Sequence, residues 1–182
     1  MPLTVQNTVG SINRLKMKKL LFIFILFNLL LTSCVNKSKY NKNLKTCEDL
    51  VTNINSFFND SLTCNSLIIK YLTDDFTFHY FPAGNRKGIK LSKQEFLDLF
   101  FDMKKKFVFN IAHTIFLPGL NELTHKIDGS VRVYYGADIF YRKDTIEFSA
   151  YQTINFDNQK ISEVWEWADY GGISNLLENE SY

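Results

Sequence analysis

The spacing of apolar residues predicts helices in the first half of this chain. Six apolar residues recur at three- and four-residue steps and form one stripe of a helix that ends at Asn59-Asp60-Ser61: Cys47, Leu50, Val51, Ile54, Phe57 and Phe58. A second, shorter helix carries Leu67, Ile68, Tyr71 and Leu72 and ends at 73–75. Both helices therefore have one face available to cover a sheet.

A strand and the clearest helix of the chain follow. Residues 76–81 alternate and are rich in aromatic side chains, which is typical of a strand, and 82–88 carry the Pro, Gly and Asn residues of a loop. Ser92 and Glu95 have the spacing of a capping box. The helix that they begin has its apolar residues on one face: Phe96, Leu99, Phe100, Met103 and Phe107.

From Val108 onward the apolar period changes from that of a helix to that of a strand. The pattern predicts strands over 108–117, 131–141, 145–156 and 161–169, separated by turn residues that include Asp128-Gly129 and Asp157-Asn158. A short helix or coil follows over 173–177. The element order predicts an α+β fold, in which N-terminal helices pack on a strongly curved antiparallel sheet and leave a pocket inside.

The first 34 residues have the pattern of a secretory signal. Met17-Lys18-Lys19 is basic, 20–31 is a 12-residue run that is apolar except for Asn28, and Leu31-Thr-Ser-Cys34 follows. That ending resembles the lipobox of bacterial lipoproteins, in which the cysteine is lipidated. We therefore expect a signal peptide over 1–33 with its true start at Met17, a lipidated Cys34 and a flexible tether over 34–45. The alternative is an uncleaved anchor, although 12 residues are short of the roughly 20 that span a bilayer.

Charge and location follow from this division of the chain. The whole chain has 21 Lys and Arg against 19 Asp and Glu, but four of the cations and none of the acids lie in 1–33, which leaves 17 against 19, a net charge of −2. A mature chain without a basic face is not expected to bind nucleic acid. Because Val35 rather than aspartate follows Cys34, the lipoprotein resemblance implies anchoring in the outer membrane, facing the periplasm.

Two further cysteines, Cys47 and Cys64, lie in the predicted helical region. An oxidising compartment would permit a disulfide between them. Two buried, unpaired thiols are the alternative.

The final strand, Lys160-Ile-Ser-Glu163-Val-Trp165-Glu-Trp167-Ala-Asp169, and the element order resemble the nuclear transport factor 2-like (NTF2-like) superfamily, in particular its SnoaL-like domains. The resemblance covers residues 46–178 and implies a cystatin-like cone. It implies no cofactor and no single function, because this fold hosts dehydratases, isomerases, cyclases and non-catalytic binding modules. A dimer formed through the sheet is a further implication.

Strict alternation from Ile161 places Trp165, Trp167 and Asp169 on one face of the last strand. If that face is the inner one, two indoles line the pocket and Asp169 is the candidate general base, as pocket acids are in related isomerases. The turn residues Gly171-Gly172 favour the alternative, that Asp169 caps the end of the strand.

His113 is the candidate partner of Asp169, since it shares the parity of Ile111 and Ile115. A hydrogen-bonded core or rim histidine is the alternative. Tyr135 is a further pocket-lining candidate. The three histidines have no metal-ligand spacing, so no metal site is expected.

These observations give two hypotheses. The first is an envelope lipoprotein whose SnoaL-like domain binds a small apolar ligand or an envelope partner without catalysis. The second is a cofactor-free SnoaL-like lyase or isomerase that uses Asp169, helped by His113. The 17 phenylalanines suit either an apolar pocket or a core filled with large side chains.

Overall fold

The computed structural model describes residues 36–59, 66–82 and 84–179. By its internal contacts the chain divides into two units, Met1–Ser38 and Lys39–Tyr182, and the account below concerns the second. The predicted signal peptide and Cys34 lie outside the described residues.

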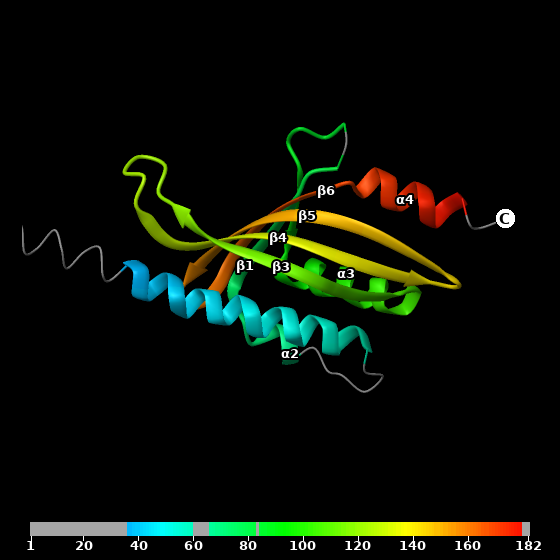
Figure 1. Ribbon diagram of the computed structural model, residues 1–182, viewed down its shortest axis with the longest axis horizontal. Helices are drawn as coiled ribbons and strands as arrows, with labels where there is room; N and C mark the ends of the chain where they lie inside the picture. Colours follow the sequence, from blue (N-terminus) through cyan, green and yellow to red (C-terminus); the bar gives the residue numbers. More distant parts are fainter. Residues whose placement is uncertain (1–35, 60–65, 83, 180–182) are drawn as a thin grey trace, which may run out of the picture. The chain divides into compact units, whose positions relative to one another are not determined.

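The second unit contains a six-stranded sheet with helices packed against it (Figure 1). A helix over residues 36–59, here called the N-terminal helix, is followed by α2 (Ser66–Ile69), β1 (Leu72–Tyr80), β2 (Ile89–Ser92), α3 (Lys93–Lys106), β3 (Val108–Leu120), β4 (Ile127–Tyr141), β5 (Asp144–Asp157), β6 (Lys160–Ala168) and α4 (Tyr170–Asn179). The strand order is β2-β1-β6-β5-β4-β3. The predicted α+β class and curved sheet are confirmed, with one difference: β1 pairs with β6 in parallel, so the sheet is mixed.

The N-terminal helix and α3 lie on the same side of the sheet (Figure 1). Phenylalanines hold the two helices together and to the sheet: Phe57 contacts Phe101 edge-on at 5.6 Å between ring centroids, and Phe58 lies 5.3 Å from Phe109 of β3. The capping box predicted at Ser92 is present, with the Ser92 amide donating to Glu95 Oε2 at 2.7 Å. The phenylalanine contacts hold the helices over the inner face of the sheet, and the capping box defines where α3 begins.

The N-terminal helix begins earlier than the sequence indicates. Residues 36–45, predicted to be a flexible tether, are helical. Asn43 lies on the buried face of this helix, and its side-chain amide donates to Gly129 O of β4 at 2.8 Å. A polar residue at a core position hid the helical pattern, so the tether prediction is wrong for this segment.

Bulges in β3 and β6 change which side chains of these strands face the helices. The register of β3 against β4 shifts between Ile111 and His113, and Asn55 of the N-terminal helix pairs there with the backbone of Ile111, donating to its carbonyl at 3.0 Å and accepting from its amide at 2.8 Å. In β6 the residue opposite Phe156 is Ile161 and the residue opposite Asn155 is Glu163, so Ser162 is the extra residue of a bulge. Each bulge reverses which side chains face the helices.

The predicted turn at Asp128-Gly129 is wrong. Both residues belong to β4, and the chain reverses at 121–126 instead, where Asn121 Oδ1 accepts from the backbone amides of Leu123 and Thr124. The strand before it continues through Pro118-Gly119, which is possible because β3 is an edge strand of the sheet.

Candidate functional site

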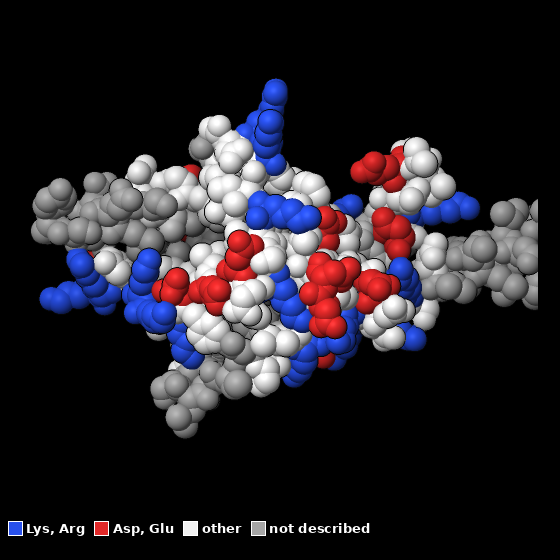
Figure 2. All heavy atoms as spheres, turned by 180° about the vertical axis from the view of Figure 1, so that it is seen from behind, with Lys and Arg blue, Asp and Glu red and all other residues white. Residues whose placement is uncertain are grey.

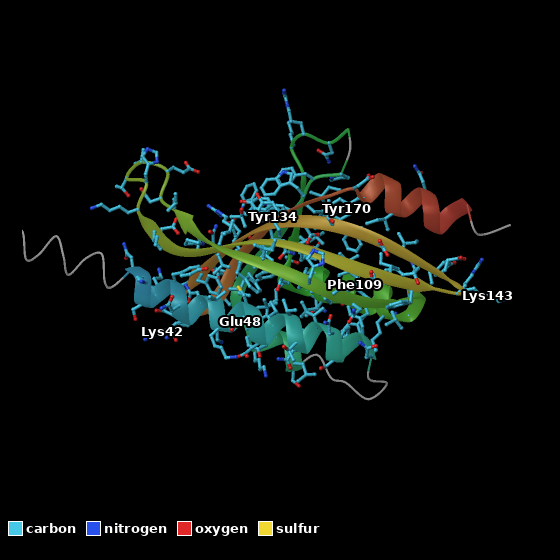
Figure 3. All side chains as sticks on the ribbon, in the orientation of Figure 1. Lys42, Glu48, Phe109, Tyr134, Lys143 and Tyr170 are labelled. Carbon is cyan, nitrogen blue, oxygen red and sulfur yellow. The ribbon has the colours of Figure 1, made fainter. Side chains whose placement is uncertain are left out.

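A cavity of about 280 Å³ lies between the helices and the inner face of the sheet. Its wall is almost entirely aliphatic and aromatic: Leu50 and Ile54 come from the N-terminal helix, Phe96 and Phe100 from α3, and Ile154 from β5. Figure 3 shows the side chains that fill the region between the N-terminal helix and the sheet, with Phe109 among them. Leu99 also lines the cavity and is 39% exposed, so the cavity reaches the surface at α3.

Four polar side chains, which we call the polar pole, form one hydrogen-bonded group in the cavity wall: Tyr135, Gln152, Glu166 and Tyr170. The Glu166 carboxylate is at its centre and is 7% exposed. Tyr135 donates its hydroxyl to Glu166 Oε2 at 2.6 Å, Gln152 Nε2 donates to the same oxygen, and the Tyr170 hydroxyl donates to Glu166 Oε1. Three neutral donors therefore hold one buried acid.

The sheet register brings these residues together. Gln152 of β5 is the direct partner of Glu166 of β6, and both point to the inner face. Tyr135 reaches the same place from β4, two strands away from β6, and Tyr170 is the first residue of α4, four residues after Glu166. The ring of Tyr170, whose hydroxyl donates to the carboxylate, also contacts Tyr80 edge-on at 5.3 Å.

The cavity makes its ionisable hydroxyl and thiol groups hard to ionise. Burial raises the pKa of Tyr135 and of Tyr170 above the usual value, and the charge of Glu166 and the hydrogen bond to it raise both further. Burial also raises the pKa of the Cys47 thiol to about 12. These groups remain protonated at neutral pH and act as donors or as apolar wall.

The two indoles are not where strict alternation places them. Trp165 and Trp167 are absent from the cavity wall, and Trp167 is 41% exposed, so the prediction that they line the pocket is wrong. The bulge at Ser162 is the cause, since it turns Val164 and Glu166 inward and the tryptophans outward.

Asp169 also lies outside the cavity. It is exposed, follows the end of β6, and accepts a hydrogen bond from the Gly172 amide at 2.8 Å through Oδ1. This is the capping arrangement that the sequence analysis gave as the alternative to a general base.

His113 is on the outer face of the sheet. It is exposed, pairs with Gly136, and follows the bulge that reverses the parity of β3 after Ile111. A Cβ atom on Gly136 would lie 2.2 Å from His113 Cε1, so the ring covers that glycine. The structure therefore does not bring His113 and Asp169 together in the cavity. Tyr135 is on the cavity wall, where the sequence analysis placed it.

Aromatic rings stack on the outer face of β1 and β6. His79 lies on Trp165 with 4.2 Å between ring centroids, and Phe81 lies on Trp167 at 4.9 Å, both pairs nearly parallel. His79 Nε2 is also 3.2 Å from Glu163 Oε1. The aromatic residues of the final strand thus build an outer-face stack instead of a pocket.

Further predictions concern cysteines, metals and membranes. Cys47 is a buried free thiol, and its proposed partner, Cys64, lies outside the described residues, as does Cys34. Within residues 36–59, 66–82 and 84–179 we find no cluster of His, Cys, Asp or Glu that could hold a metal ion. Among the helices of those same segments, none is long and apolar enough to cross a membrane.

Surface charge is mixed on the face shown in Figure 2. Lys and Arg side chains lie among Asp and Glu side chains over the described part of this face, without an extended area of one sign. The expectation that nucleic acid is not a partner stays a prediction.

Of the polar pole, the sequence predicts Tyr135 alone, because strict alternation from Ile161 places Glu166 on the face opposite Trp165 and Trp167. The signal was available: Ile161 and Val164 are three residues apart, which is an odd spacing for two inward residues of one strand and indicates a bulge between them. Continuing the alternation from Val164 would have placed Glu166 in the pocket.

Neither a family model nor a curated protein matches the sequence. Solved structures do match. BvnE pinacolase from Penicillium brevicompactum has a TM-score of 0.60 and 13% identity, over 78% of this chain and 95% of that chain. A phenazine biosynthesis-related protein from Pseudomonas aeruginosa has a TM-score of 0.56 and 12% identity, over 79% and 89%. An NTF2-like protein from Anabaena variabilis has a TM-score of 0.53 and 18% identity, over 71% and 91%. At these identities the likeness shows a shared fold.

Proposed function

We propose that this chain, which has the fold of NTF2-like proteins, binds a small and largely apolar ligand in the cavity between its helices and its sheet. The observation that carries the proposal is the cavity itself, with a nearly continuous apolar wall and one polar pole. Natural small-molecule sites share this composition, in which apolar surface supplies affinity and a few polar groups fix orientation.

The cavity volume limits the ligand. A dry apolar cavity of about 150 Å³ holds benzene, so a cavity of 280 Å³ accommodates roughly twelve non-hydrogen atoms. Each methylene group that such a ligand buries contributes about 0.8 kcal/mol until the space is full.

Binding is favoured over the lyase or isomerase alternative by the position of Asp169. That residue is exposed and engaged with the Gly172 amide, so it cannot serve as a base inside the cavity. Of the roughly four acceptor positions of the Glu166 carboxylate, the acid that is in the cavity, three are taken by protein donors, which leaves about one for a ligand.

A series of n-alkanols with six to twelve carbons tests the proposal, with affinities measured by calorimetry on the purified protein. We expect one site per chain, and affinity that rises with each methylene and then stops rising. Val133→Phe, which fills the cavity from its buried wall, should weaken binding at least tenfold, whereas Tyr134→Phe, at the adjacent outward position, should not.

Leu99→Trp, at the exposed part of the cavity wall, gives a second blocking variant if Val133→Phe does not fold. Absence of alkanol binding to the wild-type protein, or equal binding by the blocking variants, would refute the proposal.

The envelope location rests on the sequence of residues 17–34 alone. We propose that Cys34 is lipidated and anchors the domain to the membrane, facing the periplasm. Intact-mass analysis of the protein from its own membranes should show a chain that begins at Cys34 and carries added acyl mass. A Cys34→Ser variant should lack that mass and leave the membrane fraction. An unmodified chain that begins at Met1 or Met17 would contradict this assignment.

A further inference from the structure

The polar pole lacks a cation. Glu166 is a buried acid, and none of the described residues that line the cavity is Lys, Arg or His. An ionised carboxylate can only accept hydrogen bonds, and the three donors directed at Glu166 fit that form. A buried charge without an opposite charge is unusual, because such groups are generally paired.

The protons of the polar pole are already used within the protein. Tyr135 and Tyr170 each direct their single hydroxyl proton at Glu166, and Gln152 directs one of its two amide protons there. The groups that remain free to bond a ligand are mostly acceptors: one position on the carboxylate, the two hydroxyl oxygens and the Gln152 carbonyl oxygen. The only donor that remains in the polar pole is the second amide N–H of Gln152. A ligand group at this place must therefore donate hydrogen bonds.

A protonated amine meets both requirements. It carries the missing positive charge, and an alkylammonium group has three donors and no acceptor. Two tyrosine rings in the cavity wall suit it as well: Tyr170 donates to the carboxylate, its ring contacts Tyr80, and aromatic faces attract cations. A hydroxyl group would satisfy one acceptor without the charge, and a carboxylate would be repelled by Glu166.

We propose that the ligand of this cavity is a hydrophobic amine, whose ammonium group is held at Glu166 and whose carbon skeleton fills the apolar part. The inference rests on the proposed binding function and adds the chemical class of the ligand.

Three eight-carbon probes of matched shape test the inference: octylamine, 1-octanol and octanoate at pH 7, measured by calorimetry and by competition with one another. We expect the wild-type protein to bind octylamine at least tenfold more tightly than 1-octanol and to bind octanoate least. Glu166→Gln should abolish the difference between amine and alcohol. Glu163→Gln, which removes an acid from the outer face of the same strand, should preserve it.

If Glu166→Gln does not fold, Tyr135→Phe tests whether the preference for amine over alcohol depends on the carboxylate. It removes one donor from the carboxylate and frees an acceptor position, so the preference for amine over alcohol should be kept or increased. Loss of that preference in Tyr135→Phe would overturn the inference. Equal wild-type affinity for octanol and octylamine would overturn it as well while leaving the proposed function intact. If the wild-type protein binds none of the three probes, both proposals fail.

Discussion

At the scale of single residues, Glu166 makes the two tyrosine hydroxyls beside it harder to ionise. Burial is the main reason that the pKa values of Tyr135 and Tyr170 are raised, and the Glu166 charge adds to it. Because burial remains in the variant, we expect Tyr135 and Tyr170 to stay protonated in Glu166→Gln, as in the wild type, up to the pH at which the protein unfolds. Ultraviolet difference titration, with Tyr135→Phe and Tyr170→Phe to assign the signals, measures this. Ionisation of either hydroxyl near the usual pKa of 10 in the folded wild-type protein would contradict the assignment.

Glu163, on the outer face, gives the fold a pH-dependent contribution. Burial opposes ionisation of its carboxyl, but hydrogen bonds from Trp165 and Asn155 and the charges of His79 and Lys90 outweigh burial, so the pKa of Glu163 lies below its usual 4.5. A lowered pKa in the folded state stabilises the protein above pH 4.5, and this stabilisation is lost as the pH falls through the lowered value.

We therefore expect Glu163→Gln to melt at a lower temperature than the wild type at pH 7, and the two melting temperatures to converge as the pH falls below 4.5. Calorimetric melting between pH 3 and pH 7 measures the difference. The exposed acid Glu147 of β5 supplies a control, Glu147→Gln, for the loss of one surface carboxylate. A constant difference between Glu163→Gln and the wild type at all pH values would contradict the assignment.

At the scale of elements, Asn43 decides whether the start of the N-terminal helix belongs to the folded domain. Its buried amide donates to Gly129 O, so Asn43→Ala loses that bond and leaves a buried carbonyl without its partner. We expect a loss of about 1–3 kcal/mol in the free energy of unfolding, measured by urea denaturation.

Asn59→Ala is the matched control for Asn43→Ala. It replaces an exposed asparagine of the same helix, and we expect an effect within about 0.5 kcal/mol. In the wild-type protein the amides of residues 40–48 should exchange hydrogen slowly. Rapid exchange there, together with a neutral Asn43→Ala, would support the flexible tether that the sequence suggested.

The elements that the sequence predicts well are those whose periodicity is unbroken. The capping box at Ser92 and the apolar face of α3 follow from local spacing alone. β2 was not predicted, because four residues between a loop and a helix carry too little pattern. The sequence predicts the position of β6 correctly but places its residues on the wrong faces. The extra residue Ser162 reverses the alternation, and this bulge is visible only in the pairing of β6 with β5.

At the scale of the whole molecule, the element order was sufficient to predict the fold. Helical periodicity at 47–58 and 96–107, with two-residue periodicity at 76–81 and after Val108, predicts helices that cover one face of a sheet. The resemblance to the NTF2-like superfamily is confirmed as to fold. The parallel pairing of β1 with β6 joins strands far apart in the sequence, which local pattern does not encode. The expected dimer and the lipid anchor stay predictions, whereas Cys47, one half of the expected disulfide, is a free thiol in the structure.

The central claim is that the cavity with Glu166 in its wall holds a ligand. The most direct measurement is a crystal structure of the protein purified from its own cells, without added ligand. We expect electron density in the cavity with its polar end within hydrogen-bond distance of the Glu166 carboxylate. An empty or collapsed cavity, or bound material only at the outer-face tryptophans, would contradict the account.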